Sequence, residues 1–215
     1  IGEHMAFVFP PLICYFLFLL SNASRYTKNR NALHGIGLTL SVAALILSHN
    51  AIAIMFLSII GLYWLYLFFT QSKKSIGFLV SSAYFFVLGF GAAAFFWIPA
   101  YFEGKYTLRD IVTASDYGTR FVPLRWFFYS AWNYGQGNEL TKSVGIAQWI
   151  GVLASLFVIW KMKEKQIRPL VIGAVVLFFG SLFMMTSASG FVWERISLLQ
   201  KFQFPWRFLS VSVFL

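Results

Sequence analysis

Charged residues are scarce in this chain of 215 residues, and acidic ones are the scarcest. Asp, Glu, Lys and Arg together make up 11% of the sequence, and only seven residues are acidic. A water-soluble domain carries about 25% charged residues, so this chain cannot cover a water-facing surface of ordinary size. Hydrophobic residues make up 59% of it and aromatic residues 20%. The composition therefore predicts an integral membrane protein.

Cysteine, histidine and the standard catalytic motifs are also rare or missing. Cys14 is the sole cysteine, which excludes an internal disulfide, and it lies within an apolar run where a thiol packs as a small hydrophobic group. With only three histidines beside it, we expect no metal site in this chain. No phosphate-binding glycine loop, H-E-x-x-H zinc helix or G-x-S-x-G nucleophile turn occurs. We expect no cofactor here, and a divalent cation only in a longer, full-length protein.

Long apolar runs are abundant. A run of about 20 apolar residues can cross about 30 Å of hydrocarbon, and it has to be helical there because lipid cannot pair its backbone groups. The sequence predicts an all-α, polytopic transmembrane helical bundle, a single region over residues 1–215 with six spans and the start of a seventh. Ser48-His49-Asn50 separates the second and third spans as a tight turn. The expected spans are 5–20, 33–48, 51–69, 76–97, 144–160, 170–185 and 204–215.

Both ends of the chain favour a fragment of a longer protein. The chain starts at Ile1 instead of Met and shows no signal peptide with a cleavage site. It stops at Leu215, inside an apolar run that opens at Phe204. That run is too short to span a bilayer, so we expect the rest of its helix to follow.

Basic residues gather in three loops between the expected spans. Loops 21–32, 70–75 and 161–169 hold nine of the 17 Lys and Arg residues with one acid, Glu164, whereas the rest of the chain holds eight basic residues and six acids. Lys and Arg accumulate in cytoplasmic loops, so we predict that these three loops are cytoplasmic and that the protein is a multi-pass plasma-membrane protein. This distribution accounts for most of the formal charge of +10 without a nucleic-acid partner.

The longest loop, 99–142, falls on the extracytoplasmic side in this topology. A loop of this length is uncommon unless it has a function or folds as a cap. Its aromatic residues between Trp126 and Trp132 are typical of a segment at the membrane interface.

Four polar residues at the outer face are candidate contacts for a lipid phosphate or a sugar: His49, Asn50, Glu103 and Arg207. His49 can donate a hydrogen bond to such a group or carry a proton, or it can simply cap a helix. Glu103 can hold a sugar hydroxyl or a basic side chain, or it can be a solvated loop acid. The Arg207 guanidinium can bind phosphate oxygens in a bidentate way, or it can snorkel to the interface.

Four short segments, in chain order, resemble a known family. They are Gly2-Glu3 with Pro10-Pro11, Ser48-His49-Asn50, Phe96-Trp97-Ile98-Pro99 with Glu103, and Phe204-Pro205-Trp206-Arg207-Phe208. Together they resemble the membrane proteins related to 6-pyruvoyl-tetrahydropterin synthase, which are similar to GT-C glycosyltransferases and to YfhO-like membrane proteins. The pterin-synthase activity itself is not implied, because that soluble enzyme uses a zinc site of histidines.

The resemblance implies an enzyme that takes a sugar from a polyprenyl-phosphate donor and transfers it outside the cytoplasm. The catalytic acid of GT-C enzymes lies in the first outer loop, which would precede Ile1, so no catalytic residue can be assigned within this chain. His49 and Arg207 are the expected contacts of the lipid phosphate.

Two alternatives stay open beside this transferase. A lipid flippase or transporter is one, although polar residues at a single face and spans almost free of charge argue against ion-coupled transport. A non-catalytic membrane scaffold that uses the long loop as an interaction surface is the other. In all three readings the expected partners include membrane lipids, with a polyprenyl-phosphate donor in the first.

Overall fold

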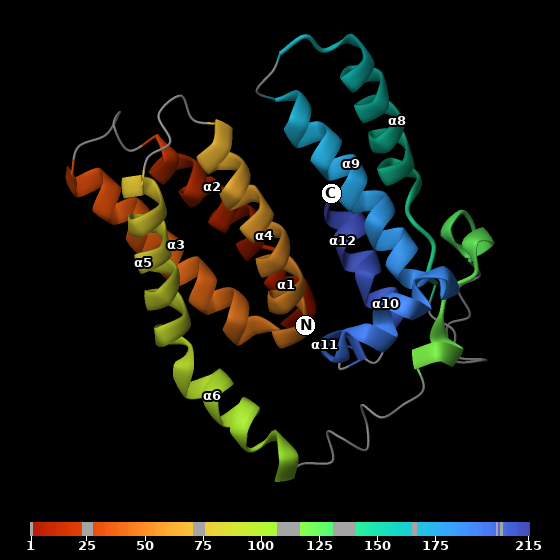
Figure 1. The fold of residues 1–215 in the computed structure, drawn as a ribbon, viewed down its shortest axis with the longest axis horizontal. Helices are drawn as coiled ribbons and strands as arrows, with labels where there is room; N and C mark the ends of the chain where they lie inside the picture. Colours follow the sequence, from red (N-terminus) through yellow and green to blue (C-terminus); the bar gives the residue numbers. More distant parts are fainter. Residues whose placement is uncertain are drawn as a thin grey trace. The chain divides into compact units, whose positions relative to one another are not determined.

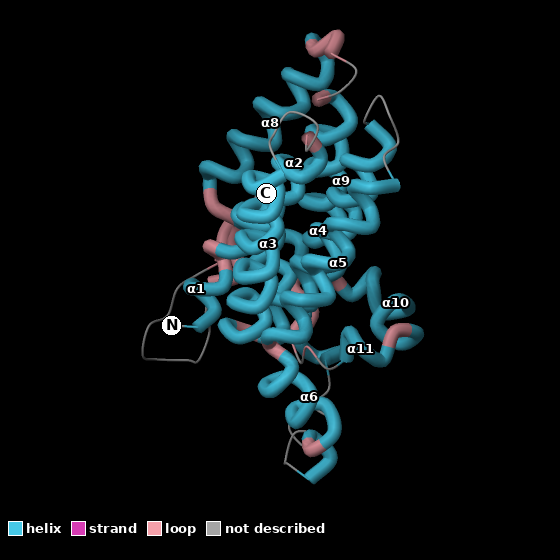
Figure 2. The backbone as a smooth tube through the Cα atoms, turned by 90° about the vertical axis from the view of Figure 1, so that its left-hand side faces the viewer, coloured by secondary structure: helices cyan, strands magenta, loops and turns pink. Residues whose placement is uncertain are grey.

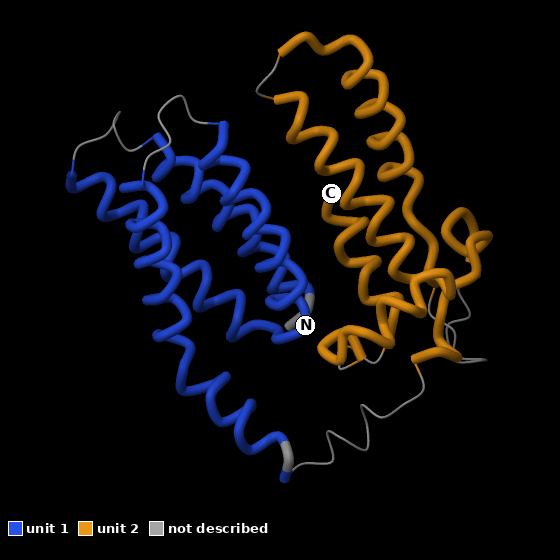
Figure 3. Tube along the Cα trace, in the orientation of Figure 1, with its two compact units in different colours: residues 1–106 blue, residues 107–215 orange. Residues whose placement is uncertain are grey.

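The computed structural model describes residues 2–22, 28–70, 76–106, 117–130, 141–164, 167–200, 202 and 204–215. Within these ranges every regular element is a helix and no strand occurs, which confirms the all-α prediction (Figure 2). The chain divides into two compact units, Ile1–Tyr106 and Thr107–Leu215 (Figure 3). Each unit has its own hydrophobic core.

Unit 1 is a helical bundle built around α3 (Figure 1). Its elements are α1 Gly2–Ala6, α2 Phe9–Ser21, α3 Lys28–Ser48, α4 Asn50–Thr70, α5 Ile76–Ala92, α6 Ala94–Phe102 and the 3-10 turn η2 Gly104–Tyr106. Helix α3 packs along both α2 and α5. The Phe85 ring of α5 fills the space that a side chain at Gly35 would occupy. The Phe16 ring of α2 does the same at Gly37. Two glycines two positions apart in the sequence thus let neighbouring helices approach opposite sides of α3.

Unit 2 consists of a helical hairpin with shorter elements at its open end. Helices α8 and α9 form the hairpin, and α12 packs along α9. Its elements are η3 Tyr117–Arg120, η4 Leu124–Phe127, α8 Ile146–Lys161, α9 Arg168–Met185, η5 Ser187–Ser189, α10 Gly190–Arg195, α11 Ser197–Gln200, η6 Pro205–Phe208 and α12 Leu209–Phe214. The buried core includes Val122, Phe127 and Val144, so part of the expected outer loop folds into this unit.

Several helices are long and apolar enough for a multi-pass membrane protein. Four qualify by length and composition, and a fifth does so if α5 and α6 together form one bent span. The four are His4–Ser21, Lys28–Ser48, Asn50–Thr70 and Arg168–Met185. The expected count of six spans and the start of a seventh is not confirmed. Helix α8 has only 16 residues, about 24 Å at 1.5 Å per residue, and the run from Phe204 opens with the 3-10 turn η6 before α12.

The fourth expected span, 76–97, differs most from the prediction. Helix α5 ends at Ala92, the axis turns by 67°, and α6 continues to Phe102. Pro99 lies inside α6 and does not mark the start of the loop 99–142. The break instead follows Gly89 and Gly91, two residues that weaken a helix because they have no side chain to pack and much backbone freedom to lose.

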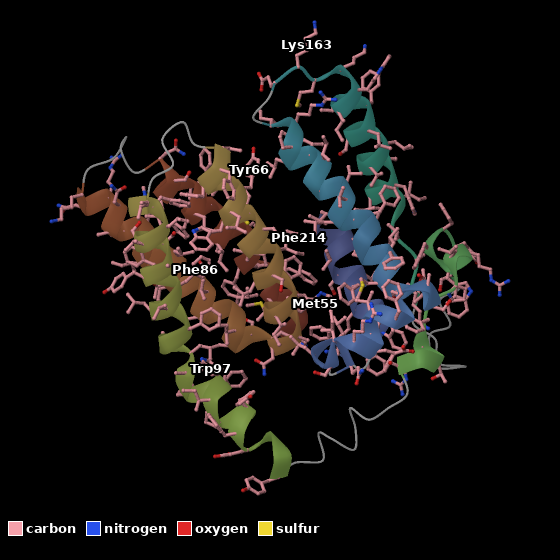
Figure 4. All side chains as sticks on the ribbon, viewed as in Figure 1. Met55, Tyr66, Phe86, Trp97, Lys163 and Phe214 are labelled. Atoms are coloured by element: carbon pink, nitrogen blue, oxygen red, sulfur yellow. The ribbon has the colours of Figure 1, made fainter. Side chains whose placement is uncertain are left out.

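Helix ends alternate within each unit as successive membrane crossings require. In unit 1 the end of α2, the start of α3, the end of α4 and the start of α5 gather at one end, and the junction of α3 with α4 lies at the other (Figure 1). In unit 2, Lys161, Lys163 and Arg168 lie at the closed end of the hairpin, where Figure 4 labels Lys163. Four of the nine basic residues behind the topology prediction fall outside the described residues: Arg25, Lys73, Lys74 and Lys165.

Candidate functional site

His49 is the single residue between α3 and α4, and it belongs to the hydrogen bonding of both. Its backbone N–H donates to the Leu45 carbonyl (3.3 Å), and its own carbonyl accepts from the Ala53 N–H (2.9 Å). Its Nδ1 accepts from the Ile52 N–H at 3.3 Å. His49 therefore caps the N-terminus of α4, the simpler of its two expected roles, and the tight turn is confirmed.

This cap fixes the imidazole and leaves one ring nitrogen for another partner. A ring nitrogen that accepts a hydrogen bond carries no proton, so Nε2 holds the N–H of the neutral ring. Asn50, the first residue of α4, is exposed beside it. Lys28 begins α3 and both residues follow the last residue of that helix, Ser48, so they lie at the end of α3 opposite Lys28, as the predicted topology requires.

Glu103 ends α6 and is exposed. Its backbone N–H donates to the Pro99 carbonyl at 2.8 Å, and its carbonyl accepts from the Tyr106 N–H at 2.9 Å. No contact in the described part of unit 1 joins its carboxylate to His49 or Asn50. Glu103 thus has the geometry of a solvated loop acid.

Arg207 rests against aromatic rings in unit 2. It lies in η6 and is partly buried, with its guanidinium carbon 5.8 Å from the centre of the Phe204 ring. That ring is stacked on Trp206, with centroids 4.5 Å and planes 18° apart. A guanidinium beside a ring keeps its in-plane N–H groups for other partners. We call Phe204, Trp206 and Trp126 the aromatic shelf.

Two further cations lie on the aromatic shelf. The Arg120 guanidinium carbon is 4.5 Å from the Phe204 centroid, and the Lys142 Nζ is 4.5 Å from Trp206 and 4.9 Å from Trp126. Arg120 and Arg207 share the Phe204 ring, so their guanidinium carbons are at most about 10 Å apart. Among the described residues, no carboxylate forms an ion pair with any of the three cations.

Trp193 joins several elements of unit 2 around one buried ring. Its side chain is fully buried, and its Nε1–H donates to the Met184 carbonyl at 3.0 Å, at the end of α9. Tyr117 is stacked on it with centroids 5.5 Å apart, and Phe208 meets it edge-on at 6.1 Å. Segments from three parts of the chain therefore share one aromatic centre.

Backbone hydrogen bonds fix part of the expected outer loop onto the hairpin. The Val122 N–H donates to the Met185 carbonyl (2.8 Å), and the Val144 N–H donates to the Phe127 carbonyl (2.9 Å). The backbone N–H of Lys142 donates to the Ser130 Oγ at 3.2 Å. This part of the loop is therefore a folded cap at the open end of α8 and α9. Trp132, which we also expected at the interface, lies outside the described residues.

Sequence reasoning found Arg207 but missed Arg120 and Lys142. Both lie in the loop 99–142, where the sequence alone does not distinguish them from ordinary surface cations. Each also lies over a ring far along the chain, Phe204 for Arg120 and Trp206 for Lys142. The available signal was the combination of basic and aromatic residues in two separate outer segments.

Two grooves in the described residues lie away from these side chains. A groove of about 270 Å³ runs between α8, α9 and the end of α12, and one of about 450 Å³ lies between α4 and α5. Neither is lined by His49, Asn50, Glu103 or Arg207. Within the same residues, no group of three or more His, Cys, Asp or Glu side chains is placed to hold a metal ion.

Comparison with known proteins gives no relative for this chain. No protein-family model, curated protein or solved structure matches it.

Proposed function

We propose that the folded cap of unit 2 binds the phosphate group of a membrane lipid, and that the whole protein uses this site to transfer a sugar from a polyprenyl-phosphate donor at the extracytoplasmic face. The observation that carries the proposal is the convergence of Arg120, Lys142 and Arg207 on one aromatic shelf. The sugar-transfer step comes from the resemblance of the short segments, and the anion-binding step from the geometry.

Three cations gathered without described acidic partners favour an anion as their ligand. Like charges held close together repel one another, and an incoming phosphate relieves that repulsion. Guanidinium groups match phosphate oxygens with two parallel hydrogen bonds, whereas the lysine ammonium acts as a point charge. The rings beside them keep these side chains in place for such a ligand.

The position of these cations supports the same conclusion. They lie at the end of the α8–α9 hairpin opposite Lys161, Lys163 and Arg168, which we place on the cytoplasmic side. Positive charge normally accumulates on that cytoplasmic side. A cationic cluster on the outer side runs against this trend and therefore calls for a ligand.

The test is binding of polyprenyl phosphate to the full chain in lipid nanodiscs. We expect Arg207→Ala to weaken binding by about tenfold or more, because a hydrogen bond to a charged group is lost. The affinity of Arg207→Lys should lie between those of the unchanged protein and Arg207→Ala, since lysine keeps the charge but lacks the forked pair of donors of the guanidinium. Binding of the uncharged polyprenol should change little in either variant.

Arg125→Ala is the matched control. Arg125 is an exposed cation of the same cap, and among the described residues it lies over no ring. If Arg125→Ala weakens binding as much as Arg207→Ala does, the lipid is attracted by the net positive charge of the cap and no specific site exists. Unchanged binding by Arg207→Ala would equally overturn the proposal.

A lipid flippase is the second candidate, because the chain contains a broken apolar helix. The axis turns by 67° between α5 and α6, and broken helices are a feature of transporters. Equal transfer of labelled lipid across vesicle membranes with and without a sugar acceptor would favour the flippase. Sugar transfer without movement of lipid between leaflets would favour the transferase.

A further inference from the structure

The break between α5 and α6 is closed by one side-chain hydrogen bond. Among the described residues, no backbone N–H donates to the Phe90 carbonyl, which in a continuous helix would accept from Ala94. The Trp97 Nε1–H donates to it instead, at 2.9 Å. Figure 4 labels Trp97 at this bend. In lipid each freed carbonyl needs a partner, and the indole supplies it.

The break is a defined structure. Ala93 is fully buried at the corner, its N–H donates to the Gly89 carbonyl (3.2 Å), and its own carbonyl accepts from Phe96 (3.0 Å). Both backbone groups of Ala93 are therefore paired at the corner. Such a corner sets a fixed direction for α6.

Helix α6 is apolar around its whole circumference and unburied. None of its residues is buried in unit 1, and Phe95, Tyr101 and Phe102 are 73%, 70% and 64% exposed. An exposed helix without a polar face is unsuited to water. Tryptophan and tyrosine, both present here, settle at the level of the lipid head groups.

The lengths of the two helices place α6 at that level. Helix α5 has 17 residues, or about 25 Å, which falls short of a hydrocarbon core of about 30 Å. The nine residues of α6 extend about 13 Å, but at 67° to α5 they add only about 5 Å along its axis. The bent pair thus reaches about 30 Å, and the first charged residue after Ile76 is Glu103, at its end.

We propose that α6 lies along the membrane interface, with its aromatic rings among the lipid head groups. The partner of this surface is the bilayer itself, because α6 continues a membrane-spanning helix and ends where charge begins. This inference depends on the membrane embedding of unit 1, and it is independent of the phosphate site in unit 2.

Spin labels report the depth of each helix position. Cys14 is replaced by Ala, and single cysteines carrying a nitroxide are placed at Val80, Tyr84 and Val87 on α5, all more than half exposed. The same is done on α6 at Phe95, Ile98 and Phe102, which are 73%, 40% and 64% exposed. In phosphatidylcholine vesicles, collision with oxygen relative to a water-soluble nickel chelate gives the depth.

The ratio of the two depth gradients tests the proposal. Depth should change by about 1.5 Å per residue along α5. Along α6 it should change by only about 0.6 Å per residue, since the helix is inclined by 67°. Equal gradients would mean one straight span and would overturn the proposal.

The other outcomes separate the possible causes of failure. Strong collision of α6 labels with the nickel chelate alone would place the helix in water, and weak collision with both agents would place it under protein. Either result overturns the interfacial position while leaving the membrane embedding intact. If the α5 labels fail to collide with oxygen in lipid, the embedding of unit 1 itself is wrong.

Discussion

The packing of α5 against α3 makes a sharp prediction for Gly89→Ala. A Cβ at Gly89 would lie 2.8 Å from the Val42 Cβ and 2.9 Å from the Thr39 carbonyl oxygen. The Thr39 carbonyl oxygen is a backbone atom, so it cannot move without displacing α3. The Thr39 Oγ1–H also donates to the Phe85 carbonyl at 3.1 Å, so separating α3 and α5 weakens an interhelical hydrogen bond. Overpacking of this kind costs about 1–3 kcal/mol.

The assay is reversible unfolding of the purified chain in mixed micelles with increasing SDS. We expect Gly89→Ala to lower the free energy of unfolding by about 1–3 kcal/mol. Gly91→Ala is the matched control, because no atom lies within 4 Å of a Cβ built there and alanine is the better helix former. The control should be neutral or slightly stabilising. Equal effects of the two substitutions would refute the close approach of α3 and α5.

Two further substitutions test single hydrogen bonds at helix ends. His49→Ala should lower the free energy of unfolding by about 1 kcal/mol through loss of the α4 cap, and His49→Asn should restore most of it; equal losses in both would show that the ring has another role. Trp97→Phe keeps a ring but removes the donor to the Phe90 carbonyl, so α6 should straighten and its depth gradient should approach that of α5. An unchanged gradient would mean that the indole does not fix the break.

Much of the fold was predictable because apolar length and turn position are local properties. The turn at His49 follows from two spans too long to be one helix, and the structure has it at that residue. The break at Ala93 was not predicted, because Pro99 is the stronger local signal for a helix end. Pro99 removes one hydrogen bond inside α6, yet the helix continues past it to Phe102. The chain bends earlier, after the glycine-containing stretch that ends α5.

The candidate site was predictable only in part, because its contacts join distant segments. Arg207 stood out as a cation at the start of an apolar run, whereas Lys142 gained meaning only from the two indoles that enclose it. Cation–ring contacts leave no spacing pattern in a sequence when their partners come from different loops. The aromatic residues from Trp126 onward in the loop 99–142 indicated a membrane interface, and Trp126 and Phe127 belong to the folded cap.

The central proposal is that the cap recognises a phosphate group on a lipid. The direct measurement compares binding of polyprenyl phosphate and polyprenol of equal chain length to the full chain in nanodiscs, at low and high salt. We predict tighter binding of the phosphate, with a difference that shrinks as salt screens the Arg and Lys side chains. Equal binding of the two lipids at low salt would contradict the account.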